Sequence, residues 1–355
     1  MTSNKIIQVL LMFSIASLGA FLFYLLSFPI PWILGPLSVI LLTKLITKKS
    51  TNLPIVFNNI ALMLIGIYFG LSFTNSTIET IIPYIFPFLL STVLLLIVSI
   101  GISIILSKFI ELDPITSVFG SIPGGLSEMV AASESLSANS AMVTILQTVR
   151  LLTVVFTVPF LVVHMFSSNT VQFEPIVSIT QTGNFLHYGW FLLAMLVGWL
   201  IRDLLPAAFV LGPLIVIASL SVIGIPLPNL APILLIAAQI TVGMSMGNKI
   251  SIKDLKLAGK YGGYYFALTL LLILTSFGIG YLFSNLSTLS LSTSILSLAP
   301  GGMVEMVLTA QSVGADSSVV SALQLIRLLF IILVVPSFLK FMFRKAENKT
   351  VKTTV

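Results

Sequence analysis

Residues 123–159 read PGGLSEMVAASESLSANSAMVTILQTVRLLTVVFTVP, and residues 300–336 read PGGMVEMVLTAQSVGADSSVVSALQLIRLLFIILVVP. The two stretches are identical at 17 of 37 positions, without a gap, at a constant offset of 177 residues. The same offset relates Gly35-Pro36 to Gly212-Pro213 earlier in each half. The sequence therefore predicts that one structural unit is present twice.

The composition places the chain in a membrane. Of its 355 residues 57% are hydrophobic and only 8% are charged, the mean hydropathy is +1.14, and cysteine is absent. Because a soluble domain carries about 25% charged residues, these values exclude a cytosolic enzyme, a secreted disulfide scaffold and a disordered regulator. We predict an all-α polytopic protein whose main partner is the lipid bilayer.

Ten stretches are apolar and long enough to cross the hydrocarbon core, which takes about 20 residues. They lie near 6–28, 30–46, 55–73, 82–107, 139–165, 185–201, 207–224, 231–248, 261–283 and 317–340. A shorter apolar segment, broken by glycines, precedes the last span of each half, at 115–136 and 292–313. We predict about ten transmembrane helices with a broken or re-entrant hairpin in each half.

The basic residues predict how these segments are threaded. If each broken segment enters and leaves on one side and the N-terminus is cytoplasmic, 15 of the 17 Lys and Arg residues face the cytoplasm, as the positive-inside rule requires. If the segments crossed fully, the cluster Lys249–Lys260 would lie outside. Each half then has five crossings, and an odd number makes the second half inverted relative to the first.

This topology divides the chain into four parts in the plasma membrane, with both termini cytoplasmic. They are a first membrane repeat over 1–165, an external linker over 166–184, a second membrane repeat over 185–343 and a basic cytoplasmic tail over 344–355.

Two cations lie inside predicted spans. Arg150 and Arg327 are equivalent in the duplication, and Gln147 and Gln324 lie three residues before them, on the same helix face. A charge at the bilayer centre costs about 3 kcal/mol and normally faces a partner inside the protein. We predict that these four residues contribute to substrate binding.

The obvious partners of the arginines are Glu128 and Glu305. Two interpretations stay open for them. They brace the hairpins through the arginines or cap the restarted helices, or they bind a coupling ion, H⁺ or Na⁺.

The Pro-Gly-Gly segments predict a site for an anion. A helix that restarts after Gly125 or Gly302 presents unpaired N–H groups and the positive end of its dipole, and two such ends near the midplane suit a carboxylate. We therefore add Gly124, Gly125, Gly301 and Gly302 to the predicted substrate-binding residues.

The segments Pro123–Met129 and Pro300–Met306, each followed by Gln-x-x-Arg and a further proline, resemble the AbrB-type duplicated membrane protein family over essentially the whole chain. Members carry two labels, regulator of gene expression and ammonia monooxygenase. Oxygen chemistry needs several converging metal ligands, which two histidines and no cysteine do not supply. Direct DNA binding fits badly too, because neither 166–184 nor the tail is large enough for a recognition domain.

We expect an ion-coupled secondary transporter of a small anionic or zwitterionic solute. It would be no enzyme and would use no metal or cofactor beyond the coupling ion. Its partners would be the small solute and not nucleic acid, a homodimer stays open, and any effect on gene expression would be indirect. The alternative is a non-transporting regulatory or receptor-like membrane protein that acts through a partner.

Overall fold

The computed structural model describes residues 3–47, 53–124, 126–136, 138–166, 185–205 and 207–353, and for 3–7, 126–128, 185–186, 252–256 and 344–353 it describes the backbone alone. Across these ranges all regular structure is helical. The predicted linker at 166–184 lies outside the described residues except for Phe166.

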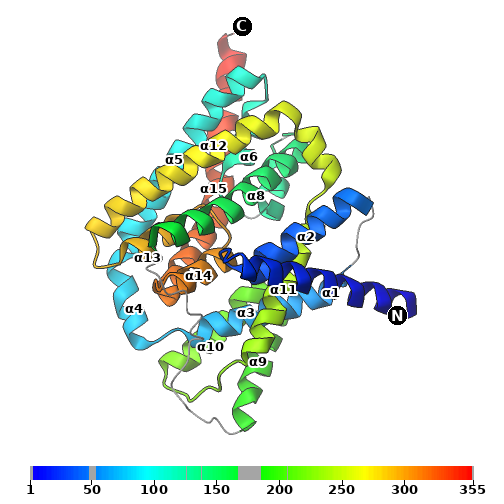
Figure 1. Cartoon of the computed structure of the whole chain (residues 1–355). Coiled ribbons are helices and arrows are strands. Elements are labelled where there is room, and N and C mark those ends of the chain that lie inside the picture. Colours follow the sequence, from blue (N-terminus) through cyan, green and yellow to red (C-terminus); the bar gives the residue numbers. More distant parts are fainter. Residues whose placement is uncertain are drawn as a thin grey trace. The chain divides into compact units, whose positions relative to one another are not determined.

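Several helices are long and apolar enough to cross a membrane (Figure 1). Five stretches meet this criterion within the described residues: Gln8–Leu25, Asn75–Ile110, Ser140–Phe166, Leu257–Asn285 and Ser317–Phe343. The other predicted spans coincide with shorter helices of 12 to 18 residues. Each of the ten apolar stretches therefore contains a helix, and the protein is a helical, membrane-embedded one.

The helices form two compact units, and each unit takes segments from both halves of the sequence. Unit 1 comprises Met1–Pro83, Pro159–Ile252 and Val304–Ser321, and unit 2 comprises Tyr84–Val158, Lys253–Met303 and Ala322–Val355. The boundaries of the units thus differ from those of the sequence duplication.

Unit 1 is built around helices from both halves. Its helices are α1 (Ser3–Leu25), α2 (Pro31–Thr47), α3 (Ile55–Leu71), α4 (Asn75–Ile81), α9 (Gly189–Leu200), α10 (Ala208–Val222), α11 (Pro232–Lys249) and α14 (Met303–Ser312), with a short 3₁₀ turn at Phe185–Tyr188. The main packing pairs are α1 with α2, α2 with α11, α3 with α10 and α9 with α10.

The central contacts of unit 1 are reciprocal. A side chain at Gly66 on α3 would meet the backbone of Val210 on α10, and a side chain at Gly243 on α11 would meet the backbone of Ile33 on α2. The offset of 177 residues turns the first contact into the second. Gly66 and Gly243 thus allow close helix packing, as their Gly-x-x-x-Gly spacing predicts, and the contacts have the form of a two-fold interface.

The contacts at helix ends in unit 1 are also related by the repeat offset. The ammonium group of Lys44, near the end of α2, donates to the carbonyls of Asn248 (2.7 Å) and Ile250 (2.6 Å) at the end of α11. Its repeat equivalent, Ser221 on α10, donates to Gly70 O at the end of α3 (3.5 Å). Lys44 thus pairs carbonyls at the C-terminal end of α11, whereas Gly70 O also accepts from the amide of Phe73.

Unit 2 holds the first interrupted segment and the second one as far as Met303, so both Pro-Gly-Gly breaks lie in it. Its helices are α5 (Ile85–Ile110), α6 (Pro114–Ser121), α7 (Leu126–Glu134), α12 (Ile252–Asn285) and α13 (Leu291–Leu298), together with most of α8 (Ser140–Phe166) and α15 (Ser317–Thr353), and a 3₁₀ turn at Ile82–Tyr84 precedes α5. Helix α12 is interrupted at Gly259 (φ 44°, ψ −128°), two residues before the span predicted from the sequence.

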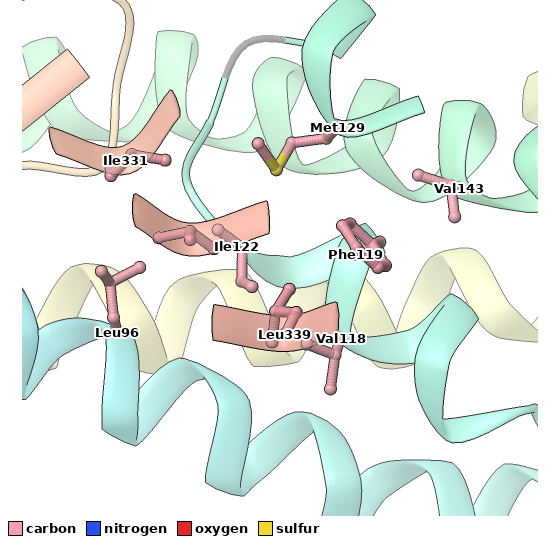
Figure 2. Close-up of a cluster of buried hydrophobic side chains, with 9 residues drawn as sticks. Leu96, Val118, Phe119, Ile122, Met129, Val143, Ile331 and Leu339 are labelled. Atoms are coloured by element: carbon pink, nitrogen blue, oxygen red, sulfur yellow. The ribbon is translucent and has the colours of Figure 1, made fainter. Parts of the chain in front are cut away.

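A cluster of apolar side chains holds the end of α6 in unit 2 (Figure 2). Val118, Phe119 and Ile122 pack with Met129 of α7 and with side chains of α5, α8 and α15. The side chains of Val118, Phe119 and Ile122 are fully buried. The backbone at Ile122, which directly follows α6, is therefore anchored by its own side chain.

Candidate functional site

Both Pro-Gly-Gly segments interrupt a helix at the predicted place. Helix α6 ends at Ser121 and α7 begins at Leu126, while α13 ends at Leu298 and α14 begins at Met303. At each break the amide of the first glycine donates to the carbonyl two residues earlier, Gly124 to Ile122 and Gly301 to Ala299, both at 2.8 Å. Gly125 lies outside the described residues.

The first interrupted segment is a hairpin. The backbone amide of Asn139, which follows α7, donates to Oγ1 of Thr116 in the first turn of α6 (3.1 Å). The chain therefore returns to the level at which α6 began. With eight residues, α6 is only about 12 Å long, well short of the roughly 30 Å hydrocarbon core.

The two helices that follow the interrupted segments begin with matched caps. Asn139 Oδ1 accepts from the amide of Met142 at the start of α8 (3.0 Å), and Asp316 Oδ1 accepts from that of Val319 at the start of α15 (3.1 Å). Asn139 and Asp316 are therefore the N-cap residues of α8 and α15. They fix the register of α8 and α15, which carry the Gln and Arg residues.

Gln147 and Gln324 close the ends of α6 and α13. Gln147 Nε2 donates to the carbonyls of Phe119 (2.5 Å) and Ile122 (3.1 Å). Gln324 Nε2 donates to Leu296 O (2.7 Å) and Ala299 O (3.4 Å), at positions shifted by the repeat offset. Both side chains are buried.

The guanidinium groups bind the same helix ends. Arg150 Nη1 donates to the carbonyl of Ile122, and its Nη2 donates to Gly124 O (3.2 Å). Arg150 is only 7% exposed.

The second copy repeats this arrangement. Arg327, 4% exposed, donates from Nη1 to the carbonyls of Leu298 (3.2 Å) and Ala299, and from Nη2 to Gly301 O (3.0 Å). Sequence reasoning placed Arg150 and Arg327 in equivalent roles, and the structure gives them equivalent partners.

These contacts have a simple electrostatic meaning. The C-terminal end of a helix carries unpaired carbonyls and about half a negative charge. A guanidinium group donates to these carbonyls and offsets that charge, but it brings a full positive charge of its own. Each guanidinium group therefore adds positive charge to its break, while the side chain of Glu128, which follows the first break, lies outside the described residues.

Of the two glutamates, Glu305 has a described side chain. Glu305 lies in the first turn of α14 and is 5% exposed. Within the described residues, the ion pair formed at 4 Å or less joins Arg202 and Asp203. The side chain of Glu128 lies outside the described residues.

A buried hydroxyl network beside α6 was missed by the sequence reasoning. The hydroxyl of Tyr265 on α12 donates to Oγ (2.7 Å) and to the carbonyl oxygen (2.9 Å) of Ser117. Ser103 Oγ donates to the same carbonyl (2.9 Å). The available signal was the spacing of Ser99, Ser103 and Ser107, which places three hydroxyls on one face of α5.

The long apolar helices and the interrupted segments define a polytopic helical membrane protein. Residues 2–82 and 32–343 match the family model described as "Transition state regulatory protein AbrB". The chain belongs to the AbrB family, as the Pro-Gly-Gly segments indicated.

Two relatives are similar to this chain, one over its full length and one over about a third of it. "Uncharacterized protein YhjN" of Bacillus subtilis (strain 168) is 26% identical over 377 residues, covering 99% of this chain and 98% of that protein. "Putative regulator AbrB" of Escherichia coli (strain K12) is 33% identical over 129 residues, which is 36% of each chain. No solved structure matches the chain significantly.

Proposed function

We propose that this protein is an ion-coupled secondary transporter of a small anionic or zwitterionic solute in the plasma membrane. The observation that carries the proposal is the pair of equivalent breaks in unit 2, each with a buried arginine and no carboxylate paired to it in the described residues. Irregular backbone at membrane depth is tolerated beside protein or a water-filled cavity. A buried guanidinium group favours an anionic group on the solute.

The packing directions in unit 1 support an inverted arrangement of the two copies. Gly243 and then Gly247 on α11 lie against Ile33 and then Leu37 on α2, so α2 and α11 run parallel. Helix α11 is the repeat equivalent of α3. If α2 and α3 are consecutive crossings they run antiparallel, and α11 then has the direction opposite to α3, which is the relation between inverted repeats.

The charges support the same arrangement. Shifting the chain by 177 residues places a neutral or acidic residue opposite every Lys and Arg except Arg150 and Arg327. In inverted repeats, two equivalent residues near helix ends lie on opposite sides of the membrane. The positive-inside rule disfavours Lys and Arg on the external side, so only one residue of such a pair is expected to be basic. A residue near the midplane keeps its depth on inversion, and the two arginines fit that position.

Glu305 supports ion coupling. A carboxyl group that is 5% exposed and forms no ion pair in the described residues is costly to keep charged. Binding of H⁺ or Na⁺ would remove that cost, and we propose this role for Glu305.

Uptake into proteoliposomes tests the proposal. Labelled phosphate, sulfate, acetate, succinate, lactate, glycine and glutamate would be offered under H⁺ and Na⁺ gradients. We expect gradient-driven accumulation of at least one of them, lost in Arg150→Gln and Arg327→Gln. Arg202→Gln is the matched control, because Arg202 has an exposed side chain beside Asp203, and it should leave uptake unchanged. Unchanged uptake in folded Arg150→Gln and Arg327→Gln variants would contradict the proposed site.

The names of the relatives favour a second candidate, a membrane protein that regulates gene expression without transport. We propose that any such effect follows from the solute carried. An Arg327→Gln variant that folds, fails to transport and still changes expression like the wild type would favour the second candidate instead.

A further inference from the structure

Three exposed lysines of unit 2 lie near helix ends: Lys108 on α5, Lys260 on α12 and Lys340 on α15. The first two helices meet where their lysines lie. Ile110, the last residue of α5, belongs to a cluster of buried side chains, and Tyr261 of α12 packs against this cluster. The end of α5 and the part of α12 that follows Gly259 are therefore neighbours.

The C-terminal part of α15 leads to the same end of the unit. Leu339 and Val118 belong to one buried cluster and lie beside each other in Figure 2. One turn further along α15, Met342 packs against the cluster, as does Ile115 in the first turn of α6. Because α6 begins directly after α5, this part of α15 lies toward the end of α5 that carries Lys108.

An exposed aromatic side chain adjoins each of the three lysines. In chain order they are Phe109 (80% exposed), Tyr264 (48%) and Phe341 (67%). Phe109 and Phe341 directly follow their lysines, and Tyr264 lies one helical turn after its own. Aromatic rings concentrate at the level of the lipid headgroups, and lysine side chains extend their ammonium groups to the same level.

The charge at this end of unit 2 is positive. Residues 108–113, 253–260 and 340–352 contain nine Lys and Arg residues and four Asp and Glu residues, and Glu134 at the end of α7 reduces the excess to four. Among the described side chains of unit 2, no carboxylate lies within 4 Å of a lysine ammonium group. The positive charge of this end is therefore available to an external anion.

We propose that this end of unit 2 binds anionic phospholipids selectively, through Lys108, Lys260 and Lys340. The ammonium groups attract the phosphate of the headgroup, and the three aromatic rings contact the region where the headgroup joins the acyl chains. A nucleic acid or an acidic protein would use the lysines but would leave the rings without an apolar partner. The positive-inside rule explains the sign of the charge here, and the proposal adds a preference among lipids that is independent of transport.

Native mass spectrometry of the purified protein tests the preference by counting bound lipids. Phosphatidylglycerol and phosphatidylcholine with the same acyl chains would be titrated in a neutral detergent. We expect phosphatidylglycerol to bind at a concentration about ten-fold lower, because several lysines contribute to the attraction. Equal binding of the two lipids would overturn the proposal.

A double variant with a charge-matched control assigns the preference to these lysines. Lys108→Gln combined with Lys260→Gln removes two positive charges and should reduce the preference to about two-fold or less. Arg202→Glu changes the net charge by the same amount at an exposed residue of unit 1 and should keep the preference. A preference that survives in the double variant, or that is lost equally in Arg202→Glu, would contradict the assignment. If the double variant fails to fold, the two single variants replace it.

Soluble anions distinguish a lipid from other negatively charged partners. Glycerol 3-phosphate carries the phosphate without acyl chains, poly-glutamate represents an acidic protein, and a single-stranded oligonucleotide represents nucleic acid. We expect none of them to displace bound phosphatidylglycerol at an equal concentration. Displacement by any of them would show that the lysines recognise negative charge without a lipid and would overturn the proposal, while gradient-driven uptake of a solute would leave the proposed function standing.

Discussion

The half-helices α6 and α13 end alike but are anchored differently. At their C-terminal ends an arginine and a glutamine donate to carbonyls at equivalent positions. Along its length α6 is held by hydroxyls, because Ser117 is bonded to Ser103 and Tyr265. The equivalents of these three residues are Ser294, Gly280 and Phe88.

The comparison shows that both copies need donors at the C-terminal end of the half-helix, whereas the contacts along the half-helix can differ between the copies. A helix broken at membrane depth leaves carbonyls that need donors, so both breaks keep Arg and Gln. The contacts that hold the half-helix along its length differ between the two copies. On α13, Ser294 Oγ is buried with no partner in the described residues, and Gly280 allows close backbone contact at Ile295.

The largest loss of stability should come from removing the arginine at either helix end, which both copies share. Arg150→Met removes two hydrogen bonds to carbonyls at the first break and Arg327→Met removes three at the second, and we expect each to lower the free energy of unfolding by about 3 kcal/mol. Thermal unfolding in detergent would measure the two losses. Because the geometry is repeated, the losses should be similar, and a large loss in only one variant would break the equivalence of the two ends.

The second-largest loss of stability should come from disturbing the close contact between Gly280 and Ile295 on α13. A Cβ on residue 280 would lie 2.9 Å from Ile295 Cα, so Gly280→Ala should destabilise the protein by about 2 kcal/mol through overpacking. Gly278→Ala on the same helix is the control, since a Cβ there meets nothing within 4 Å. Equal unfolding midpoints for the two variants would show that α13 is not held by close contact.

The hydroxyl network on the α6 side should give a smaller effect. Tyr265→Phe removes the donor to Ser117 and should cost about 1 kcal/mol. Tyr281→Phe, at a tyrosine that is 56% exposed, should leave the unfolding midpoint unchanged. If the two variants behaved alike, the proposed difference in anchoring would fail.

The caps that follow the interrupted segments should show the smallest effect. Asp316 accepts from the amides of Ser318 and Val319 and from the Ser318 hydroxyl, whereas Asn139 accepts from the amide of Met142. Asp316→Ala should therefore cost about 1 kcal/mol and Asn139→Ala about half of that. The reverse order in a thermal unfolding series would contradict the capping geometry.

Much of this comparison could be predicted from the sequence. Apolar length located the ten helices, Pro-Gly-Gly located both breaks, and the duplication identified the Arg and Gln residues. The partners of the arginines could not be predicted. They are backbone carbonyls, which every residue carries, so no residue type in the sequence marks them, whereas carboxylates are visible in the sequence as Glu128 and Glu305. The Tyr265–Ser117 bond joins residues 148 positions apart, so only the tertiary fold reveals it.

The opposite orientation of the two copies is the central claim, and labelling of single cysteines tests it most directly. The chain has no native cysteine, and the exposed residues Lys108 and Asn285 are repeat equivalents at the ends of α5 and α12. With a membrane-impermeant maleimide, we predict that Lys108→Cys reacts only from the cytoplasmic face and Asn285→Cys only from the external face. Reaction of both from the same face would show parallel copies and contradict the account.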